Sequence, residues 1–518
     1  MAYRSPYPDI TVPTINLTEQ VFGNASNWPD AIAMADGLTG RTITYGSLLE
    51  QIRRTAAGLA ARGIKKGDVV SLWSPNVPEW PVVFFGVIRL GAIVHTSNPV
   101  STPDELAYQL TDGGVKILFT VGALADKAKQ AIAESGRAIE LFTIDDTPGL
   151  PSLASLAIDA DPPAVTIDPA NDLCVLPYSS GTTGMPKGVM LTHRNLVAQL
   201  TQIDSIESVA TPALLGVLPF FHIYGMVILV MHGLMRRSTI VTMPKFEFEP
   251  FLKVLQDWPI VTAHIVPPIV VGLGKHPAVD NYKFPHLKFL FSGAAPLGPE
   301  LTDAVEKRLN VKIRQGYGMT EASPATHYTV AGTERSGTAG RLMPSIEMRM
   351  ISPETGEDVP SGTPGEVWVR GPNVMKGYLN NPDATAKTVD ADGWLHTGDI
   401  GIADDEGYLT VVDRLKELIK VKGFQVAPAE LESVLLKHPK IADVAVIPVP
   451  DEHSGEVPKA IVVMRDTLTA EDVIEFLKPK VAHYKCVKHV AFVDAIPKSP
   501  SGKILRRLLV DKERAARS

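Results

Sequence analysis

Residues 178–189 read Tyr-Ser-Ser-Gly-Thr-Thr-Gly-Met-Pro-Lys-Gly-Val, and this stretch is more informative about fold and function than any other. Its first part, Ser179–Gly184, contains only small or hydroxylated residues and cannot form a packed core element. Glycine lets backbone N–H groups approach a polyanion, and Lys187 adds a point charge suited to a phosphate. Because a strand-like segment, Leu173–Tyr178, leads into this run, we predict a phosphate-binding loop rather than a flexible surface loop.

The stretch does not match the phosphate-binding loop of the P-loop NTPases. That pattern requires Gly-Lys-Ser/Thr after a glycine and four intervening residues. Counted from Gly181, the second glycine position holds Pro186 and the Ser/Thr position holds Gly188. The sequence therefore argues against a P-loop NTPase.

Length and composition indicate a multidomain globular protein. The chain has 518 residues, 45% of them hydrophobic and 21% charged, with a formal net charge of −7. One hydrophobic core does not extend over such a length, so two or more domains are expected. The acidic balance argues against general nucleic-acid binding. The two cysteines, Cys174 and Cys486, exclude a disulfide scaffold and indicate core thiols in a reducing compartment.

No segment predicts a membrane span or a targeting signal. The N-terminal residues lack the apolar run of a signal peptide, and the most apolar stretch, Met226–Met235, is too short to cross a bilayer. The last residues differ from the peroxisomal signal Ser-Lys-Leu. We therefore expect a cytoplasmic protein with no membrane span.

The first half of the chain alternates helix-like and strand-like patterns, which predicts parallel sheets covered by helices. Apolar residues at helical spacing predict helices, and short apolar runs predict strands. The helices are expected at Tyr45–Arg62, Trp80–Leu90 and Ala123–Ser135, and the strands at Val69–Trp73, Ile93–His95, Ile117–Val121 and Ile139–Ile144.

The second half contains two further patterns. From about Gly337, short strands between turn clusters predict a small β-rich subdomain, with strands at Glu347–Ile351, Glu366–Arg370 and Tyr408–Val412. After Arg414, a compact α+β unit is predicted, with helices at Pro428–Lys437 and Ala470–Val481 and strands at Val444–Pro448, Ala460–Met464 and Val490–Phe492. We therefore predict an α/β protein. Its N-terminal domain, residues 1–413, would hold two parallel-type α/β subdomains and the β-rich subdomain, followed by a hinge at 414–416 and a small mobile domain at 417–518.

Five further motifs occur downstream of the first loop, at Gln315–Glu321, Trp394–Asp399, Val412–Arg414, Lys416–Gln425 and Pro497–Ile504. Together they resemble, in order and spacing, the adenylate-forming superfamily of acyl-CoA synthetases, nonribosomal adenylation domains and beetle luciferases. The resemblance extends from about Ala31 to the C-terminus. Within the superfamily, the stretches Pro219–Tyr224, Ser292–Gly298 and Lys422–Val426 are most similar to the branch of 4-coumarate–CoA ligases and firefly luciferase.

This resemblance implies a two-step ligase that uses ATP, CoA and Mg²⁺. A carboxylate first attacks the α-phosphate of ATP to give an acyl-adenylate, and the CoA thiol then displaces AMP. Because an anion attacks a polyanion, fixed positive charge and Mg²⁺ have to neutralise the developing charge. The implied partners are thus a small carboxylic acid, ATP and CoA, with no nucleic acid.

The resemblance assigns the adenylation step to Lys503, which a Pro/Ser/Gly loop would present. Glu321 and Thr183 would hold the metal, Asp399 the ribose hydroxyls, and Tyr317 would stack on adenine. The alternatives from sequence alone are a helix-terminal charge for Glu321, a turn residue for Asp399 and a solvated lysine for Lys503. The full predicted ATP- and AMP-binding set is Ser179, Ser180, Gly181, Thr182, Thr183, Gly184, Lys187, Ala294, Gln315, Gly316, Tyr317, Gly318, Thr320, Asp399, Arg414, Lys416 and Lys503.

The resemblance assigns the thioester step to Lys420 and Gln425. Lys245, Lys422 and Gly423 would contact CoA, and His222 would orient the carboxylate, although a lone histidine there is more often a core residue. The predicted acyl pocket consists of His222, Tyr224, Gly316, Gly318, Ala325 and Thr326. Because Lys503 and Lys420 both belong to the small domain, we expect two domain orientations about a hinge near Lys416.

Three other functions fit the same motifs less well. An amino-acid adenylation domain would carry an acidic residue near His222, and Phe220–Gly225 has none. A luciferase would be expected to carry the peroxisomal signal. A non-catalytic nucleotide sensor would not need Lys503, Lys420, Gln425 and Glu321 together.

The acyl group is expected to be cinnamate-like or a medium-chain fatty acid. The pair Ala325-Thr326 is smaller than the pair that the resemblance leads one to expect in plant coumarate ligases. The loop of Lys503 is also expected to be exposed and open to a lysine acetyltransferase, which would remove the charge and stop adenylation.

Overall fold

The computed structural model describes residues 2–179, 186–415, 417–421, 424–451, 454–499 and 502–517. The predicted strands at Val69, Ile93, Ile117 and Ile139 are found and lie in a seven-stranded sheet with the order β19-β9-β8-β5-β4-β6-β7. Strands β4 to β8 of this sheet run parallel, and β9 is antiparallel to β8. The bounds are β4 Val69–Leu72, β5 Ile93–Thr96, β6 Val115–Thr120, β7 Glu140–Thr143, β8 Leu173–Ser179, β9 Lys187–Thr192 and β19 Gly377–Tyr378.

Helices cover both faces of this sheet, because successive residues of its strands point apolar side chains to opposite faces. Ile117 and Phe119 of β6 pack into the main core, whereas Leu118 between them packs into a second cluster with Leu106 and Ala128. The predicted helices at Tyr45, Trp80 and Ala123 are found. The helices of this region are α1 Leu17–Phe22, α2 Tyr45–Ala61, α3 Trp80–Ile88, α4 Pro103–Asp112, α5 Ala125–Ser135, α6 Leu153–Leu156 and α7 His193–Ile206.

A second layer continues the parallel pattern in two sheets with the orders β10-β11-β2-β3 and β12-β13-β14-β15-β16. A parallel bridge between Ala213 and Ile260 connects the two sheets. The strands are β2 Ile32–Asp36, β3 Thr42–Thr44, β10 Ala213–Gly216, β11 Thr239–Thr242, β12 Thr262–Ile265, β13 Phe289–Ser292, β14 Lys312–Gly318, β15 Ala325–Tyr328 and β16 Arg341–Leu342. The apolar stretch at Met226 forms a buried π-helix, Gly225–Met231, followed by α8 His232–Met235; the other helices are α9 Phe248–Asp257, α10 Pro267–Lys275 and α11 Pro299–Leu309.

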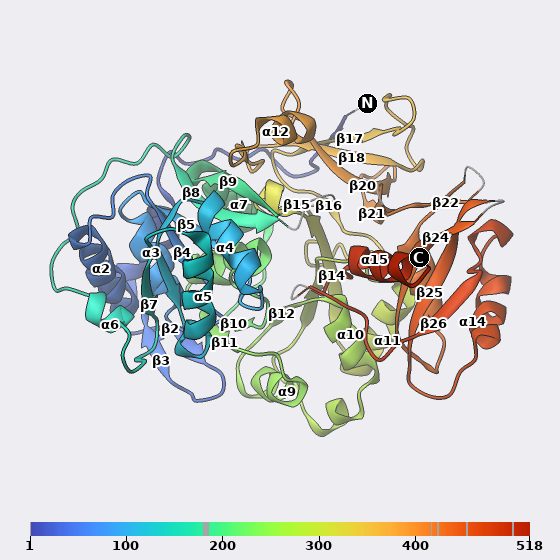
Figure 1. Cartoon of the computed structure of the whole chain (residues 1–518), viewed down its shortest axis with the longest axis horizontal. Coiled ribbons are helices and arrows are strands. Elements are labelled where there is room, and N and C mark those ends of the chain that lie inside the picture. The colour runs from blue at the N-terminus through green and yellow to red at the C-terminus, as the bar shows by residue number, and fades with distance from the viewer. Residues whose placement is uncertain are drawn as a thin grey trace.

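The predicted β-rich subdomain is an antiparallel sheet with the order β1-β17-β18-β20-β21, at the top of Figure 1. Its strands are β1 Tyr3–Arg4, β17 Glu347–Ile351, β18 Gly365–Arg370, β20 Leu395–Ala403 and β21 Leu409–Arg414, and α12 Pro382–Thr388 lies beside it.

The C-terminal region, drawn in orange and red in Figure 1, has a sheet and a core of its own. One face of the sheet packs on α13 and α14 through Leu431, Val444 and Val473, and the other packs on α15 through Ile447 and Leu509. Its elements are β22 Ile419–Val421, β23 Phe424–Val426, α13 Pro428–Leu435, β24 Ile441–Asp451, β25 Gly455–Met464, α14 Ala470–Leu477, β26 His489–Phe492 and α15 Arg506–Arg517. Helix α14 is shorter than predicted, because Pro479 follows it inside a 3₁₀ turn.

Few polar contacts join this region to the rest of the chain. Lys437 forms an ion pair with Glu300 of α11, and Nζ of Lys275 donates to the carbonyl of Leu436 at 3.2 Å. The backbone N–H of Ala429 donates to Asp413 at 2.8 Å, at the start of α13. The predicted hinge residue Lys416 lies outside the described residues, so the boundary at 414–416 stays a prediction.

Candidate active site

The predicted nucleotide residues Tyr317, Asp399 and Arg414 meet at one point. The hydroxyl of Tyr317, on β14, donates a 2.6 Å hydrogen bond to Oδ2 of Asp399. Nε of Arg414 lies 3.4 Å from Oδ1 of the same carboxylate, because the two residues are register partners on β20 and β21. Burial raises the pKa of Tyr317, and the charge of Asp399 raises it further, so the phenol keeps its proton and donates. Asp399 therefore lies within a strand, not in the turn that was its alternative.

Lys503, on the loop before α15, lies within electrostatic reach of this pair. Burial and, after it, the charge of Arg414 lower the pKa of Lys503 to about 8, against the opposing effect of Asp399. The loop is a tight turn in which the hydroxyl of Ser499 accepts from the N–H of Lys503 at 3.1 Å. Electrostatics and turn geometry together present one lysine to the Asp399–Arg414 pair.

The expectation that the Lys503 loop is exposed is wrong, because Lys503 is half-buried. The adjacent Gly502 has a φ of +78°, and a Cβ there would lie 3.2 Å from Val266 and 3.3 Å from Pro268. The loop thus presses directly against the large domain at the start of α10. This burial depends on tertiary docking, which a polar Pro/Ser/Gly sequence does not reveal.

His222 is half-buried near the same lysine. Burial lowers the pKa of His222 to about 4, and the positive charge of Lys503 lowers it further. The ring is therefore neutral at pH 7. Its Nδ1 accepts the N–H of Tyr224 at 3.2 Å, which leaves the proton on Nε2. His222 can thus donate one hydrogen bond from Nε2 to a carboxylate.

Among the described residues are only the two ends of the predicted phosphate loop. Outside them lie Ser180, Gly181, Thr182, Thr183 and Gly184. Ser179 and Lys187 are register partners where β8 and β9 meet. The buried Oγ of Ser179 has no hydrogen-bond partner in the described structure. Nζ of Lys187 lies 4.7 Å from the ring centroid of Tyr378. An unsatisfied hydroxyl beside a lysine fits the polar oxygens of a phosphate.

Glu321, the predicted metal ligand, is buried in a 3₁₀ turn, Thr320–Ala322. Its Oε1 accepts a 2.8 Å hydrogen bond from the hydroxyl of Tyr378, and Oε2 has no partner among the described residues. Thr183, the second predicted metal ligand, lies outside those residues. No group of three or more His, Cys, Asp or Glu able to hold a metal occurs in the described ranges. One free carboxylate oxygen fits Mg²⁺, which normally takes one or two carboxylates and completes its shell with phosphates and water.

The acyl-pocket residue Tyr224 is held by a histidine that the sequence did not single out. The hydroxyl of Tyr224 lies 3.2 Å from Nδ1 of His264, and the His264 ring packs on Phe291 with centroids 5.1 Å apart. Burial lowers the pKa of His264 to about 3, so this imidazole is also neutral. The wall of the predicted pocket is therefore aromatic with a neutral polar contact.

The remaining predicted acyl residues lie where β14 and β15 pair. A Cβ on Gly316 would lie 3.0 Å from the carbonyl oxygen of His327 and 3.1 Å from the Phe291 ring, so a larger residue there would require these neighbours to shift. Thr326 is fully buried, and its hydroxyl lies 3.0 Å from Nδ1 of His327 and 3.3 Å from the carbonyl oxygen of Tyr317. Ala325 is half-buried and is register partner of Gly318.

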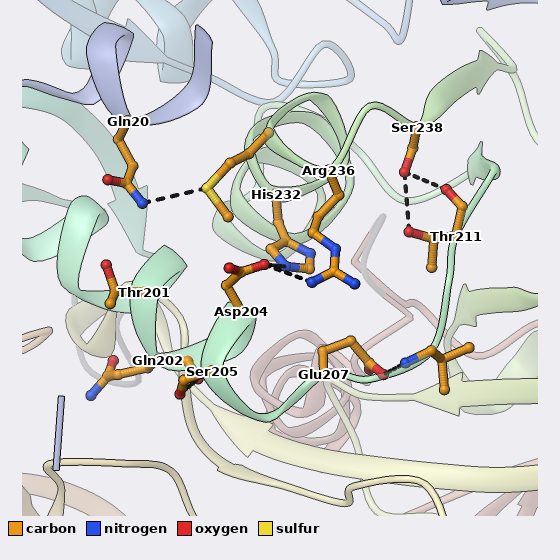
Figure 2. A network of polar contacts seen from close by, with 12 residues as sticks. Gln20, Thr201, Gln202, Asp204, Ser205, Glu207, Thr211, His232, Arg236 and Ser238 are labelled. Atoms are coloured by element: carbon orange, nitrogen blue, oxygen red, sulfur yellow. Dashed lines mark hydrogen bonds and ion pairs between the residues drawn. The ribbon is translucent and has the colours of Figure 1, made fainter. Parts of the chain in front are cut away.

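A buried ion pair supports β14 from behind. Arg314 is fully buried between aromatic rings and contacts Glu207 at 2.6 Å. Figure 2 shows Glu207 directly after α7, whereas Asp204 lies in the last turn of α7, 2.8 Å from Arg236 and 3.8 Å from His232. Glu207 also accepts the N–H of Val209 at 2.9 Å. Removing one member of such a pair leaves an uncompensated buried charge, so this network fixes the strand that carries Tyr317.

The predicted thioester residues lie elsewhere on the C-terminal region. Lys420 and Gln425 are register partners on the hairpin of β22 and β23. Lys420 is exposed, and its ammonium has no ion pair or hydrogen bond with any described residue. Lys245 is exposed and pairs with Glu247 at 3.0 Å. Lys422 and Gly423 lie outside the described residues.

The other predicted nucleotide residues flank β14. Gln315 is buried on the strand, and Thr320 opens the turn of Glu321. Ala294 is exposed, with a left-handed φ of +70°, an uncommon backbone conformation for a residue other than glycine. Arg314, His264 and Tyr378 are the site residues that sequence reasoning missed. Nothing local marks them, since each is an ordinary residue in a strand.

Family models match most of the chain. The model described as AMP-binding enzyme matches residues 21–379, and the model described as AMP-binding enzyme C-terminal domain matches residues 430–503. Among curated proteins, the chain is 44% identical to 4-coumarate–CoA ligase 2 of Petroselinum crispum, over 98% of this chain and 96% of that protein. It is 43% identical to 4-coumarate–CoA ligase of Vanilla planifolia, over 98% of this chain and 95% of that protein.

Among solved structures, the chain is similar to MatB from Rhodopseudomonas palustris at 30% identity. ATP-bound MatB gives a TM-score of 0.87 over 96% of this chain and 98% of that one. Apo MatB gives 0.76 over the same shares of the two chains. The arrangement of this chain is thus nearer to the ATP-bound form of that protein.

Proposed function

Because the chain belongs to the AMP-binding enzyme family, we propose that it is an ATP-dependent acid–thiol ligase that forms an acyl-CoA through an acyl-adenylate. The observation that carries this proposal is the docking of the Lys503 loop on the large domain, where Gly502 lies against Val266 and Pro268 and Lys503 comes within electrostatic reach of the Asp399–Arg414 pair. A nucleotide sensor would not need a lysine of lowered pKa at that point. ATP and CoA are the substrates of such ligases, and the carboxylic acid is the third.

In the first step, a carboxylate oxygen of the acid attacks the α-phosphorus of ATP, and the bond to pyrophosphate breaks. Lys503 carries its charge below a pKa of about 8, so at pH 7 it can stabilise the charge that develops on the phosphate. Nε2 of His222 donates to the carboxylate and orients it. Asp399 and Arg414 position the ribose. The ribose hydroxyls compete with Tyr317 for the carboxylate oxygens of Asp399.

Mg²⁺ is the expected metal, and Glu321 is the described residue that would hold it. Its Oε2 has no partner among the described residues, and its Oε1 is fixed by Tyr378. When bound, the ion would neutralise charge on the phosphates. Ser179 and Lys187 would bind the same phosphates from the other side.

In the second step, the CoA sulfur attacks the acyl carbon, the bond to AMP breaks, and the thiol proton is released. We assign Lys420 and Gln425 to this step and Lys245, Lys422 and Gly423 to CoA. Lys420 is exposed in the described orientation, which fits a role after a domain movement.

The proposed acid is cinnamate-like. The relatives named 4-coumarate–CoA ligase and the aromatic wall formed by Tyr224, His264 and Phe291 support this choice. Medium-chain fatty acids remain the second candidate, because Ala325 leaves room beside β14. Acetate and amino acids are expected to be poor, since the described wall offers neither a closed small pocket nor a carboxylate for an ammonium.

A panel of carboxylic acids with ATP, Mg²⁺ and CoA tests the proposal. Pyrophosphate release, AMP formation and acyl-CoA are measured for cinnamate, 4-coumarate, octanoate, acetate and phenylalanine. We expect kcat/KM to be highest for the first two acids and Ala325→Leu to reduce it most for the largest. A highest kcat/KM for acetate, or AMP formation with no CoA thioester from any acid, would contradict the proposal.

The proposal also includes a cytoplasmic location and a condition for the acetylation of Lys503. Within the described ranges, none of the helices combines the length and apolar character needed to cross a bilayer. Two free, buried cysteines support a reducing location such as the cytoplasm. Acetylation of Lys503 would need the loop to leave its half-buried position first, so a lysine acetyltransferase would act on the other domain orientation.

A further inference from the structure

The segment Asn373–Asn380, here called the strap, connects the two halves of the proposed nucleotide site. At its start, Nδ2 of Asn373 donates to the carbonyl oxygens of Ala322 at 2.6 Å and Ala325 at 3.1 Å. The N–H of Met375 donates to the carbonyl oxygen of Glu321 at 2.8 Å. The strap therefore holds the turn that carries Glu321.

At its other end, the strap pairs with the strand that follows the phosphate loop. Tyr378 is register partner of Val189, in an antiparallel pairing of β19 with β9. The N–H of Leu379 donates to the carbonyl oxygen of Gly188 at 2.8 Å. Lys187 begins β9. The strap therefore holds the backbone at both residues proposed to bind the metal–nucleotide, Glu321 and Lys187.

The side chain of Tyr378 contacts the functional groups at both ends. It is buried, with 6% of its surface exposed. Its hydroxyl donates to Oε1 of Glu321 at 2.8 Å, and Nζ of Lys187 lies 4.7 Å from its ring centroid. One tyrosine thus contacts both charged groups: its hydroxyl binds the Glu321 carboxylate, and its ring contacts the Lys187 ammonium.

Glu321 and Lys187 form no ion pair with each other or with any described residue. The face of an aromatic ring attracts a cation without neutralising it as a carboxylate would. One hydrogen bond to Oε1 fixes the carboxylate and leaves Oε2 free among the described residues. Tyr378 therefore contacts both charged groups without neutralising either, and each keeps capacity for a ligand.

We propose that Tyr378 is a positioning residue that holds Glu321 and Lys187 apart and ready for a metal–nucleotide. It directs Glu321 to the divalent cation and Lys187 to the phosphates of a nucleoside triphosphate. This inference rests on the proposed function, because it takes ATP and its metal as the ligands. Without the ring, the ammonium and the carboxylate would pair with each other in the empty site.

The hydroxyl and the ring have separable roles, so two substitutions test them. Tyr378→Phe removes the hydroxyl, which donates to Glu321 at 2.8 Å and also interacts with Thr388, and keeps the ring beside Lys187. We expect it to weaken the affinity for Mn²⁺–ATP by about 10–100-fold, the usual effect of losing a partner of a metal ligand. The affinity for metal-free ATP stays within about twofold. Tyr378→Leu also removes the cation–π contact and weakens metal-free ATP by roughly 2–30-fold.

The measurement uses the full chain and does not need turnover. Free Mn²⁺ is followed by electron paramagnetic resonance in the presence of ATP, and metal-free ATP binding is followed by calorimetry. Tyr408→Phe is the matched control. Its ring faces Arg335 at 4.9 Å and its hydroxyl donates to the carbonyl of Thr333 at 3.4 Å, in the β-rich part of the chain. We expect this control to bind both ligands like wild type.

Three results would overturn the inference. Tyr378→Phe could bind Mn²⁺–ATP as tightly as wild type. It could lose metal-bound and metal-free ATP equally, together with a lower melting temperature, which is the signature of a purely structural tyrosine. Or the wild-type chain could fail to bind Mn²⁺–ATP at all, which would remove the proposed function as well, whereas the first two results leave it intact.

Discussion

The C-terminal region carries two functional lysines in opposite situations. Lys503 lies in a tight turn pressed against the large domain, half-buried, with a pKa lowered to about 8. Lys420 lies on the hairpin of β22 and β23, exposed, with its ammonium unpaired among the described residues. Both lysines belong to the C-terminal region, whose sheet packs separate apolar clusters on its two faces. We infer that the described orientation assembles the adenylation site and leaves the thioester site open.

Under the proposed function, this contrast means that one small domain would serve both half-reactions by changing its position. The contacts that hold the described orientation include the Lys437–Glu300 ion pair, the bond from Lys275 to Leu436, and the docking of Gly502. Exposed ion pairs contribute about 0–1 kcal/mol each. Such contacts bias a domain orientation without locking it, which fits the proposed turn of this domain between the two half-reactions.

The largest expected effect comes from the docked lysine. Lys503→Ala removes the charge at the Asp399–Arg414 pair, and adenylation, measured as acid-dependent pyrophosphate release, is expected to fall about 10²–10³-fold. Acyl-CoA formation from supplied acyl-adenylate should stay near wild type. Lys498→Ala is the matched control on the same loop, since Lys498 binds Asp443 at 2.6 Å and not the nucleotide site. An equal loss of adenylation and of thioester formation would contradict the division of the two half-reactions between Lys503 and Lys420.

The reverse pattern is expected for the exposed lysine. Lys420→Ala should reduce thioester formation from supplied acyl-adenylate by about 10–100-fold, the value of a lost charged hydrogen bond. Pyrophosphate release with acid and ATP should remain unchanged. Lys440→Ala serves as a control, because Lys440 is a lysine of the same region bound to the carbonyl of Thr467 at 3.0 Å. If Lys420→Ala slowed adenylation instead, the two lysines would not divide the reaction.

The pH dependence of adenylation provides a smaller test of the docked environment. The pKa of Lys503 is lowered to about 8, so the charged form is complete below that pH and is lost as pH rises through it. We therefore expect kcat/KM for ATP in pyrophosphate release to fall roughly tenfold between pH 7 and pH 9. Lys503→Arg keeps its charge and should lack this decline, whatever its absolute rate. A wild-type profile that stays flat to pH 9.5 would show that Lys503 is not buried as described.

Sequence patterns predicted the fold well, because apolar periodicity and chain-local chemistry determine most of it. The strands at Ile117 and Glu347 and the helices at Trp80 and Pro428 are found, and the change to a β-rich pattern near Gly337 marks a real subdomain. The helix predicted to Val481 ends earlier at Leu477, where Pro479 acts within a turn. Patterning could not show how the separate sheets dock.

The site was predictable as a list of residues and not as an arrangement. Motifs named Tyr317, Asp399 and Lys503, which come together in the structure. They could not show that Lys503 is half-buried, because that burial depends on Val266 and Pro268, far away in the chain. Tyr378 and His264 escaped notice for a similar reason, since their roles come from contacts across sheets.

Cross-linking at the domain contact tests the central claim most directly. Glu300→Cys and Lys437→Cys place thiols where the ion pair joins α11 to the C-terminal region, and the natural Cys174 and Cys486 are buried and protected. A short bis-maleimide then fixes the described orientation. We predict that the linked enzyme forms acyl-adenylate in a single turnover as fast as the unlinked double variant, while its thioester formation falls more than about tenfold. Acyl-CoA formation at the unlinked rate in the fixed enzyme would contradict the two-orientation account.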